Sequence, residues 1–278
     1  MSADLDSLLR DAAEAGDQDD WEHAFQLLLA GLESFPDQPA LLCALGVAAS
    51  NLGADGAAYE YFRRCVEQQP EDPAVLATAG RGLAALDDPD AERVLRLAAI
   101  SAPDSAPARL AYGAFLAREG MTDAALRELE AARAIGGEQA VQARQELAIA
   151  LLLASRPAEA LPLLQDSGGE PWIDKIRALV LLESGEPTEA AELLHGLSEA
   201  EPADVELQLL ATLACAAEGW EDAAWGAFAR AELAAAEEDR PLLLEVEERL
   251  DAGGEAAREL LVNELGPSLL REWLVEAR

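Results

Sequence analysis

Residues 39–72 read PALLCALGVAASNLGADGAAYEYFRRCVEQQPED, and this stretch decides the fold. Small and apolar residues fill its first half up to Leu52-Gly53-Ala54, and a second apolar stretch runs from Ala58 to Cys65 before Pro70. Apolar residues at helical spacing indicate helices with one buried face, and glycine or proline marks where a helix ends. The stretch therefore predicts two antiparallel helices joined by a short turn.

The same plan recurs along the chain with a period close to 34 residues. The alanine that opens each second apolar stretch is found at Ala24, Ala58, Ala91, Ala125, Ala160, Ala190 and Ala224, with spacings of 34, 33, 34, 35, 30 and 34 residues. Such a period indicates stacked units that cannot bury their apolar faces alone. We expect a repeat array over 1–238, with units at about 5–38, 39–72, 73–105, 106–139, 140–170, 171–204 and 205–238.

Short turns that contain glycine separate the two helices in several units. They are Leu52-Gly53-Ala54, Arg118-Glu119-Gly120, Ser184-Gly185-Glu186 and Glu218-Gly219-Trp220. The unit at 140–170 departs from this plan, because Pro162 interrupts its short second helix.

This pattern resembles the tetratricopeptide repeat family. In residues 39–72 the signature positions of that family are held by Leu42, Leu45, Gly46, Gly53, Ala58, Phe62, Cys65 and Pro70. Gly46 recurs as Gly80 and Gly113, small residues that let two helices approach closely. The resemblance covers roughly residues 5–238 and implies an all-α solenoid, a right-handed superhelix of about seven antiparallel helix pairs.

Residues 239–278 lack the signature alanine but remain helical in pattern. They read as three helices, Pro241–Leu250, Glu255–Leu265 and Pro267–Ala277. A solenoid must cover its last apolar face, so we expect C-terminal capping helices here. An independent docking element is the alternative interpretation.

The net charge of −34 argues against nucleic acid or an anionic membrane as a partner. One lysine and 54 acidic residues resemble the halophile-like composition of proteins from salt-loving organisms; attraction of a basic partner is the alternative. Three cysteines without a CxxC pair predict neither a disulfide framework nor a thiolate zinc site. The acidic N-terminus and short apolar runs lead us to expect a soluble, cytoplasmic protein.

Motifs for catalysis are weak throughout the sequence. Gly80-Arg81-Gly82 begins a string that fits a dinucleotide motif, but it lies inside an expected helix and is better explained by helix packing. The sole lysine, Lys175, follows Asp174, so no phosphate-binding loop is present. The only histidines, His23 and His195, lack further ligands at metal spacing. We therefore expect no enzyme activity, no cofactor and no metal.

The resemblance implies that a concave groove, lined by the first helices, binds the partner. The groove residues carried over from the family are Cys43, Val47, Asn51, Ala77, Arg81, Leu110, Ala114, Arg118, Gln145, Ile149, Trp172, Lys175 and Leu179. Three cations in this set, Arg81, Arg118 and Lys175, are suited to pair with carboxylates of a ligand. The alternative is that the apolar members pack against neighbouring first helices. The family's clamp for a C-terminal carboxylate is not reproduced, since Leu9, Ala13, Cys43 and Val47 hold its positions.

These features predict a non-catalytic scaffold that binds a peptide or helical segment of a partner protein in its groove. A homo-oligomer is the alternative. In that case the apolar inner face, or the tail around Leu269, Leu270, Trp273 and Leu274, would bury itself against a second copy.

Overall fold

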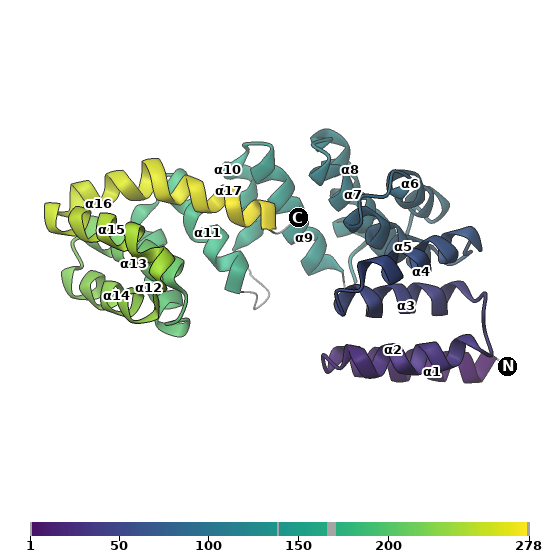
Figure 1. Cartoon of the computed structure of the whole chain (residues 1–278). Coiled ribbons are helices and arrows are strands. Elements are labelled where there is room, and N and C mark those ends of the chain that lie inside the picture. Colours follow the sequence, from purple (N-terminus) through teal and green to yellow (C-terminus); the bar gives the residue numbers. More distant parts are fainter. Residues whose placement is uncertain (1, 138, 166–170, 277–278) are drawn as a thin grey trace. The chain divides into compact units, whose positions relative to one another are not determined.

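The computed structural model describes residues 2–137, 139–165 and 171–276. Every regular element in this part of the chain is helical, as the sequence predicted, and consecutive helices pack in antiparallel pairs (Figure 1). The chain divides into two compact units, residues 1–146 and 147–278, which we call the N-terminal and C-terminal units. The division falls within α9 (Ala140–Leu153).

The N-terminal unit stacks first and second helices in two layers. Its helices are α1 (Ser2–Asp17), α2 (Trp21–Leu32), α3 (Pro39–Asn51), α4 (Asp55–Glu67), α5 (Pro73–Ala85), α6 (Ala91–Ser101), α7 (Ala106–Arg118) and α8 (Thr122–Ile135). The first helices α1, α3, α5 and α7 pack against one another in sequence, and each second helix packs against its own first helix. Helices α2, α4 and α6 also pack against the next first helix. We call the side formed by the first helices the inner face.

The C-terminal unit continues the pairs and then adds a tail. Its helices after α9 are α10 (Pro157–Leu164), α11 (Pro171–Glu183), α12 (Pro187–Ala200), α13 (Val205–Ala217), α14 (Glu221–Ala234), a 3-10 turn (Glu237–Asp239), α15 (Arg240–Ala252), α16 (Gly254–Leu260), a π-helical segment (Leu261–Leu265) and α17 (Gly266–Glu276). Pro162 lies inside α10, which is short as expected.

Glycine permits the close approach of helices that the sequence predicted. A Cβ atom added to Gly46 would lie 2.6 Å from the ring of Phe62 on α4. The same addition at Gly80 and Gly113 would place it 2.8 Å and 2.7 Å from leucines on the following helices. A Cβ atom added to Gly82, on α5, would also clash with the ring of Phe62. The glycines of the apparent dinucleotide motif therefore serve helix packing.

The turn between first and second helices has one conformation in every pair. The four glycines in the predicted turns have φ between +69° and +81°. In the remaining pairs the same place is taken by Asp19, Asp87 and Ser155, with φ of 60°, 55° and 56°. Glycine adopts this left-handed conformation without steric cost, whereas other residues do so at a cost. The backbone requirement is thus shared, although the residue differs.

The tail contains the three expected helical segments, and Gly253 separates the first from the second, but the second and third are not separated at Gly266-Pro267 as expected. A π-helical segment connects α16 directly to α17, and its end is marked by a hydrogen bond from the Gly266 N–H to the Leu261 carbonyl. Pro267 lacks an N–H group, so it cannot continue the regular α-helical bonding, and a π-helical turn absorbs such an interruption. The tail therefore runs onward without a loop.

Candidate functional site

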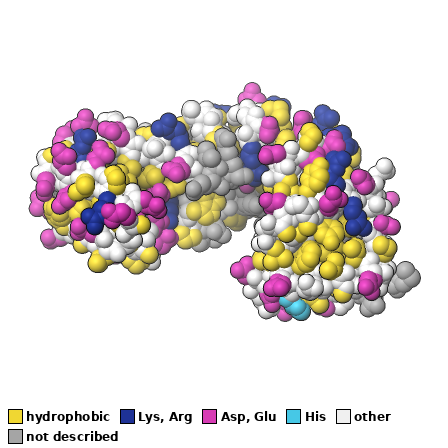
Figure 2. Space-filling view, in the orientation of Figure 1, with side chains coloured by type: hydrophobic (Ala, Val, Ile, Leu, Met, Phe, Trp, Pro, Cys, Tyr) yellow, Lys and Arg dark blue, Asp and Glu magenta, His cyan; other side chains and the backbone are white. Residues whose placement is uncertain are grey.

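The inner face of the N-terminal unit contains an open cleft with a volume of about 390 Å³. Side chains of α1, α2, α3 and α5 line it, among them Leu9, Ala13, Asp17, Trp21, Cys43, Val47, Val75 and Thr78. Alanines provide much of the remaining lining: Ala12, Ala24, Ala40, Ala44, Ala48 and Ala74. Figure 2 shows hydrophobic side chains gathered over the N-terminal helices.

Small side chains on a well-packed base explain why this part of the inner face is hollow. Leu28, which lines the cleft, belongs with Leu41 and Leu45 to a buried cluster that joins α1, α2 and α3. Much of the remaining lining is alanine, whose methyl group cannot fill the space between neighbouring first helices. The hollow is therefore a direct result of residue size along α1, α3 and α5.

Cys43 lies at the edge of this cleft and is chemically quiet. Its thiol donates a hydrogen bond to the Val75 carbonyl at a sulfur–oxygen distance of 3.6 Å. Contact with the Cys65 thiol, together with burial, raises the pKa of Cys43 well above its ordinary value. Because the thiolate is the reactive form, Cys43 acts as an apolar lining residue at neutral pH.

The structure distributes the other groove residues of the N-terminal unit differently. Val47 lines the cleft with Cys43, and Asn51 is exposed at the end of α3, where its side chain donates to the Val47 carbonyl at 2.9 Å. Other members of the set are buried, which leaves them little surface for a partner: Ala77, Leu110, Ala114 and Gln145.

Two of the three groove cations lie near a carboxylate of their own unit. Burial raises the pKa of Glu146, and the charges of Arg118 and, more weakly, Arg81 oppose that rise. An arginine attracted to Glu146 is less free to recruit a carboxylate from a ligand. The charges of Arg118 and Arg81 thus act on a carboxylate of their own unit, although Arg81 itself is exposed, and we call these three residues the internal charge group.

The third cation, Lys175, is held by its own unit as well. Its ammonium group pairs with Glu201 at 2.9 Å and also with Asp204, which caps the start of α13. Burial lowers the pKa of Lys175, but the hydrogen bonds and charges of Asp204 and Glu201 outweigh it, so the net shift is upward. Lys175 thus connects α11 to α13.

The remaining groove residues of the C-terminal unit are Ile149, Trp172 and Leu179. Ile149 is buried, Trp172 is exposed at the start of α11, and Leu179 is 1% exposed. Leu179 is covered by the tail: the Gly266 backbone comes close enough that an added Cβ would contact the Leu179 side chain at 3.8 Å.

The tail occupies the inner side of α11 and α13 along much of their length. Helix α16 packs on α13, and α17 packs on α11 (Figure 1). The Trp273 indole donates to Glu206 at 3.1 Å, and Arg258 donates to the Ala217 carbonyl at 3.1 Å. At Gly254 the backbone is so close that an added Cβ would lie 2.6 Å from the Ala216 carbonyl. The inner side of α11 and α13 is therefore covered in part by its own chain, and a cavity of about 230 Å³ remains between these helices and the tail at Leu182, Ala214 and Leu261.

The leucines proposed for self-association take part in this packing. Leu269, Leu270 and Leu274 are all buried within the C-terminal unit. These leucines present little apolar surface to a second copy, whereas Trp273, the fourth residue of that set, is only partly buried.

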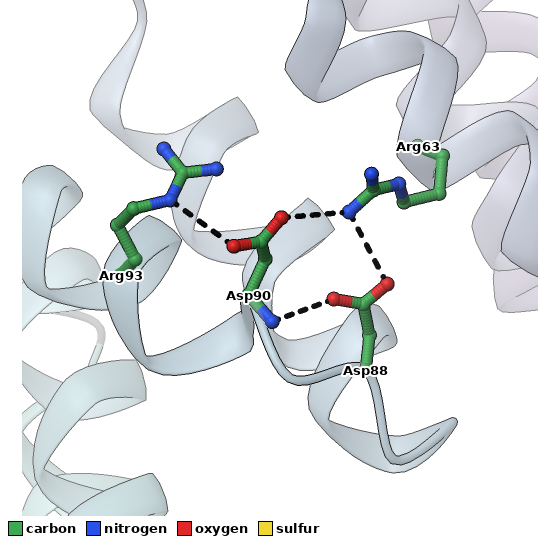
Figure 3. Close-up of polar contacts among 4 residues, drawn as sticks. All are labelled: Arg63, Asp88, Asp90 and Arg93. Carbon is green, nitrogen blue, oxygen red and sulfur yellow. Dashed lines mark hydrogen bonds and ion pairs between the residues drawn. The ribbon is translucent and has the colours of Figure 1, made fainter.

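A polar cluster that sequence reasoning missed joins α4 to the turn before α6 (Figure 3). Arg63 pairs with Asp88 at 3.3 Å and with Asp90 at 3.0 Å, and Asp90 also pairs with Arg93 at 3.3 Å. The Asp88 side chain is only 1% exposed and accepts a hydrogen bond from the Asp90 N–H at 2.7 Å. Arg93 and, next, Arg63 lower the pKa of Asp90. With all its groups paired, the cluster holds neighbouring repeats together.

Asp17 is a further cleft residue absent from the predicted set. It occupies the last groove-facing position of the first repeat, where the family rule would have identified it. Among the described residues, no group of three or more His, Cys, Asp or Glu side chains is arranged to hold a metal ion. No helix in the described ranges has the length and apolar character needed to cross a membrane.

Comparison with known proteins identifies the fold. No protein-family model matches the sequence, and no curated protein matches it. TTC0263, a thermophilic tetratricopeptide repeat protein of Thermus thermophilus, is 25% identical, with 64% of this chain and 98% of that chain covered and a TM-score of 0.53. PilW, a widely conserved type IV pilus biogenesis factor, is 20% identical, with 71% and 93% covered and a TM-score of 0.62. Pseudomonas aeruginosa PilF is 18% identical, with 73% and 94% covered and a TM-score of 0.59. In its helix pairs and in the solved structures that it resembles, the chain has the fold of tetratricopeptide repeat proteins.

Proposed function

We propose that this protein is a non-catalytic scaffold that binds a peptide or helical segment of a partner protein in the cleft of the N-terminal unit. The observation that carries the proposal is the contrast between inner faces. The N-terminal one retains an apolar hollow of about 390 Å³, whereas the C-terminal one is covered by α16 and α17. A hollow of this size with an apolar lining is typical of binding sites.

The lining favours a helical occupant. Parallel rows of small side chains on α1, α3 and α5 allow a partner backbone to approach closely, while large side chains of the partner fill the space between them. The C-terminal unit supports this geometry, because its own inner face accommodates a helix in the same manner. Val47 is the residue of the predicted set that we assign to this contact, whereas Cys43, which also lines the cleft, is only 5% exposed.

A photo-crosslinking amino acid at Thr78, in the cleft, tests the proposal in the full chain. The matched control places it at Leu97, which is exposed on α6 and does not line the cleft. We expect a discrete partner to be captured from Thr78, not from Leu97, and to be lost when Val47→Asp is added. Identical capture from both positions would contradict the proposal. Light scattering supplies the second test, because it measures the molecular mass in solution. The mass of a dimer would favour self-assembly.

A further inference from the structure

The open cleft carries a negative charge, although the predicted groove residues included three cations. Asp17 is the only charged residue among the described residues that line it. Asp17 is exposed at the end of α1 and so is accessible to a ligand. The cleft itself therefore offers a carboxylate and no cation.

The charged residues in this part of the chain are also mainly acidic. Residues 1–60 contain twelve acidic residues and one basic residue, Arg10. The next two arginines along the chain are engaged: Arg63 pairs with Asp88 and Asp90, and Arg64 donates to the Pro36 carbonyl at 3.1 Å. Arg81, exposed on α5, is the nearest remaining cation, and its charge partly opposes the rise in the pKa of Cys43. A ligand that approaches this region meets a predominantly negative field, which attracts cations and repels anions.

The tail illustrates how the inner face of this fold holds a helix. Leu261, Leu265 and Leu269 recur every fourth residue, which places them on one side of the tail, and all three are buried. At the edge of the same contact, Trp273 bonds to Glu206. An apolar stripe thus enters the inner face, while polar groups meet carboxylates at its rim.

We infer that the open cleft receives a cationic amphipathic helix of a partner protein. Leucine-sized side chains on one face of that helix fill the hollow over the alanine lining, and lysine or arginine beside the stripe pairs with Asp17 and the neighbouring carboxylates. This inference rests on the proposed function and specifies the chemistry of the partner. The apolar contact supplies most of the affinity, and the charges supply orientation and a faster association rate.

Two synthetic helices of about 18 residues test the inference. Both carry leucine at every third or fourth position; one has lysine at the remaining polar positions and the other has glutamate. Their affinities for the full chain are measured by fluorescence anisotropy at about 0.15 M KCl, where distant charges are screened. Four variants accompany the wild type. Ala44→Phe fills the cleft and Ser50→Phe adds the same bulk elsewhere on α3, while Asp17→Asn and Asp11→Asn each remove one exposed carboxylate from α1.

We expect the lysine helix to bind and the glutamate helix to bind at least about tenfold more weakly. Ala44→Phe should abolish binding and Ser50→Phe should not. Asp17→Asn should weaken binding about threefold, whereas Asp11→Asn should leave it unchanged. If Ala44→Phe does not fold by circular dichroism, Ala13→Phe fills the cleft from an exposed position on α1 instead.

Other outcomes overturn the inference in separable ways. Preferred binding of the glutamate helix, lost in Ala44→Phe, would leave a helix-binding cleft but reverse its charge preference. Binding of the lysine helix that ignores Ala44→Phe would indicate general attraction to an acidic surface, and not to the cleft. If neither helix binds, the cationic helix is wrong, and the crosslink at Thr78 decides the proposed function independently.

Discussion

The two units of this protein share one repeat plan and differ in what covers their inner faces. In the N-terminal unit, α1, α3 and α5 border a hollow that no other described segment of that unit fills. In the C-terminal unit, α16 and α17 lie on α13 and α11, and the tail covers Leu179. The same local chemistry therefore yields a receptive surface in one place and a closed core in the other.

An apolar residue at a groove position indicates a tendency to be buried, but it does not indicate which segment buries it. Leu179 and Val47 occupy the same position in their repeats, yet the tail covers Leu179 while Val47 borders an open cleft. Covering the apolar surface at such a position is favourable. The chain supplies the cover in one unit, and we propose that a partner supplies it in the other.

The largest expected effect comes from loosening the tail. Leu261 is 1% exposed, so Leu261→Ala should destabilise the C-terminal unit by about 2–5 kcal/mol through lost burial and a cavity. Guanidinium denaturation measures the loss, and hydrogen exchange should rise in α11 and α13. The adjacent Val262 is partly exposed, so Val262→Ala should cost less than about 1 kcal/mol. Equal losses in the two variants would contradict the assignment of the tail as a packed cover.

The N-terminal unit should be most sensitive at Asp88. Asp88→Asn keeps the size of the side chain but removes the charge that pairs with Arg63 and weakens the acceptor for the Asp90 N–H. We expect a loss of about 1–3 kcal/mol in the free energy of unfolding, measured by chemical denaturation. Asp87→Asn, at an exposed position with positive φ that asparagine also tolerates, serves as the control and should change little.

Because of Lys175, the stability of the C-terminal unit should depend on pH in the alkaline range. Lys175→Gln removes its pairs with Glu201 and Asp204 and should cost about 1.5 kcal/mol at neutral pH. Because the folded pKa of Lys175 is raised, this stabilisation is complete below the unfolded lysine pKa of about 10.4 and is lost as pH rises through the folded value. The difference in unfolding free energy between wild type and variant should therefore shrink at alkaline pH. A difference that stays constant would mean that the charge is not responsible.

The left-handed turns offer a smaller gain of stability in each unit. Ser155→Gly in the C-terminal unit should stabilise by about 0.5 kcal/mol, because relief of the positive φ slightly exceeds the entropy of the added glycine. Asp87→Gly in the N-terminal unit should gain less, since aspartate tolerates this conformation better than serine. Thermal melting compares the two, and a greater gain at Asp87 would reverse the expected order.

The smallest expected effect concerns the cations of the N-terminal inner face. Arg118→Gln and Arg81→Gln should each raise the pKa of Glu146 further, because each removes a positive charge that favours the carboxylate. The rise should be larger for Arg118→Gln. Titration of the Glu146 side chain by NMR measures both. If neither pKa moves, these arginines do not belong to an internal charge group and regain a role as ligand contacts.

Much of the fold could be predicted because its signals are local. The alanine period, the turn glycines and the glycines at helix contacts (Gly46, Gly80 and Gly113) each act between residues close in sequence. The structure confirms the helix pairs that they implied. The left-handed conformation at Asp19, Asp87 and Ser155 was missed, because aspartate and serine do not indicate a positive φ as glycine does. The Arg63 cluster was missed for a related reason, since it joins charges 25 and 27 residues apart.

The candidate site was predictable only in part. Cys43 and Val47 line the cleft, yet Ala77, Leu110 and Ala114, assigned by the same positional rule, are buried. Lys175 was expected to face a ligand and instead pairs with Glu201 and Asp204 of its own chain. A positional rule gives the direction of a side chain, but not what neighbouring segments place against it.

By itself, the sequence determined that this chain is a series of paired helices with small residues at their contacts and an apolar side. Residue size and helical periodicity are sufficient for that result, because they act over a single repeat. Only the tertiary structure decided which inner face remains open. That outcome depends on where α16 and α17 pack, and α17 begins more than 80 residues after the end of α11, the helix that it covers. Packing between such distant segments is settled by the shape and burial of whole surfaces, which no local pattern encodes.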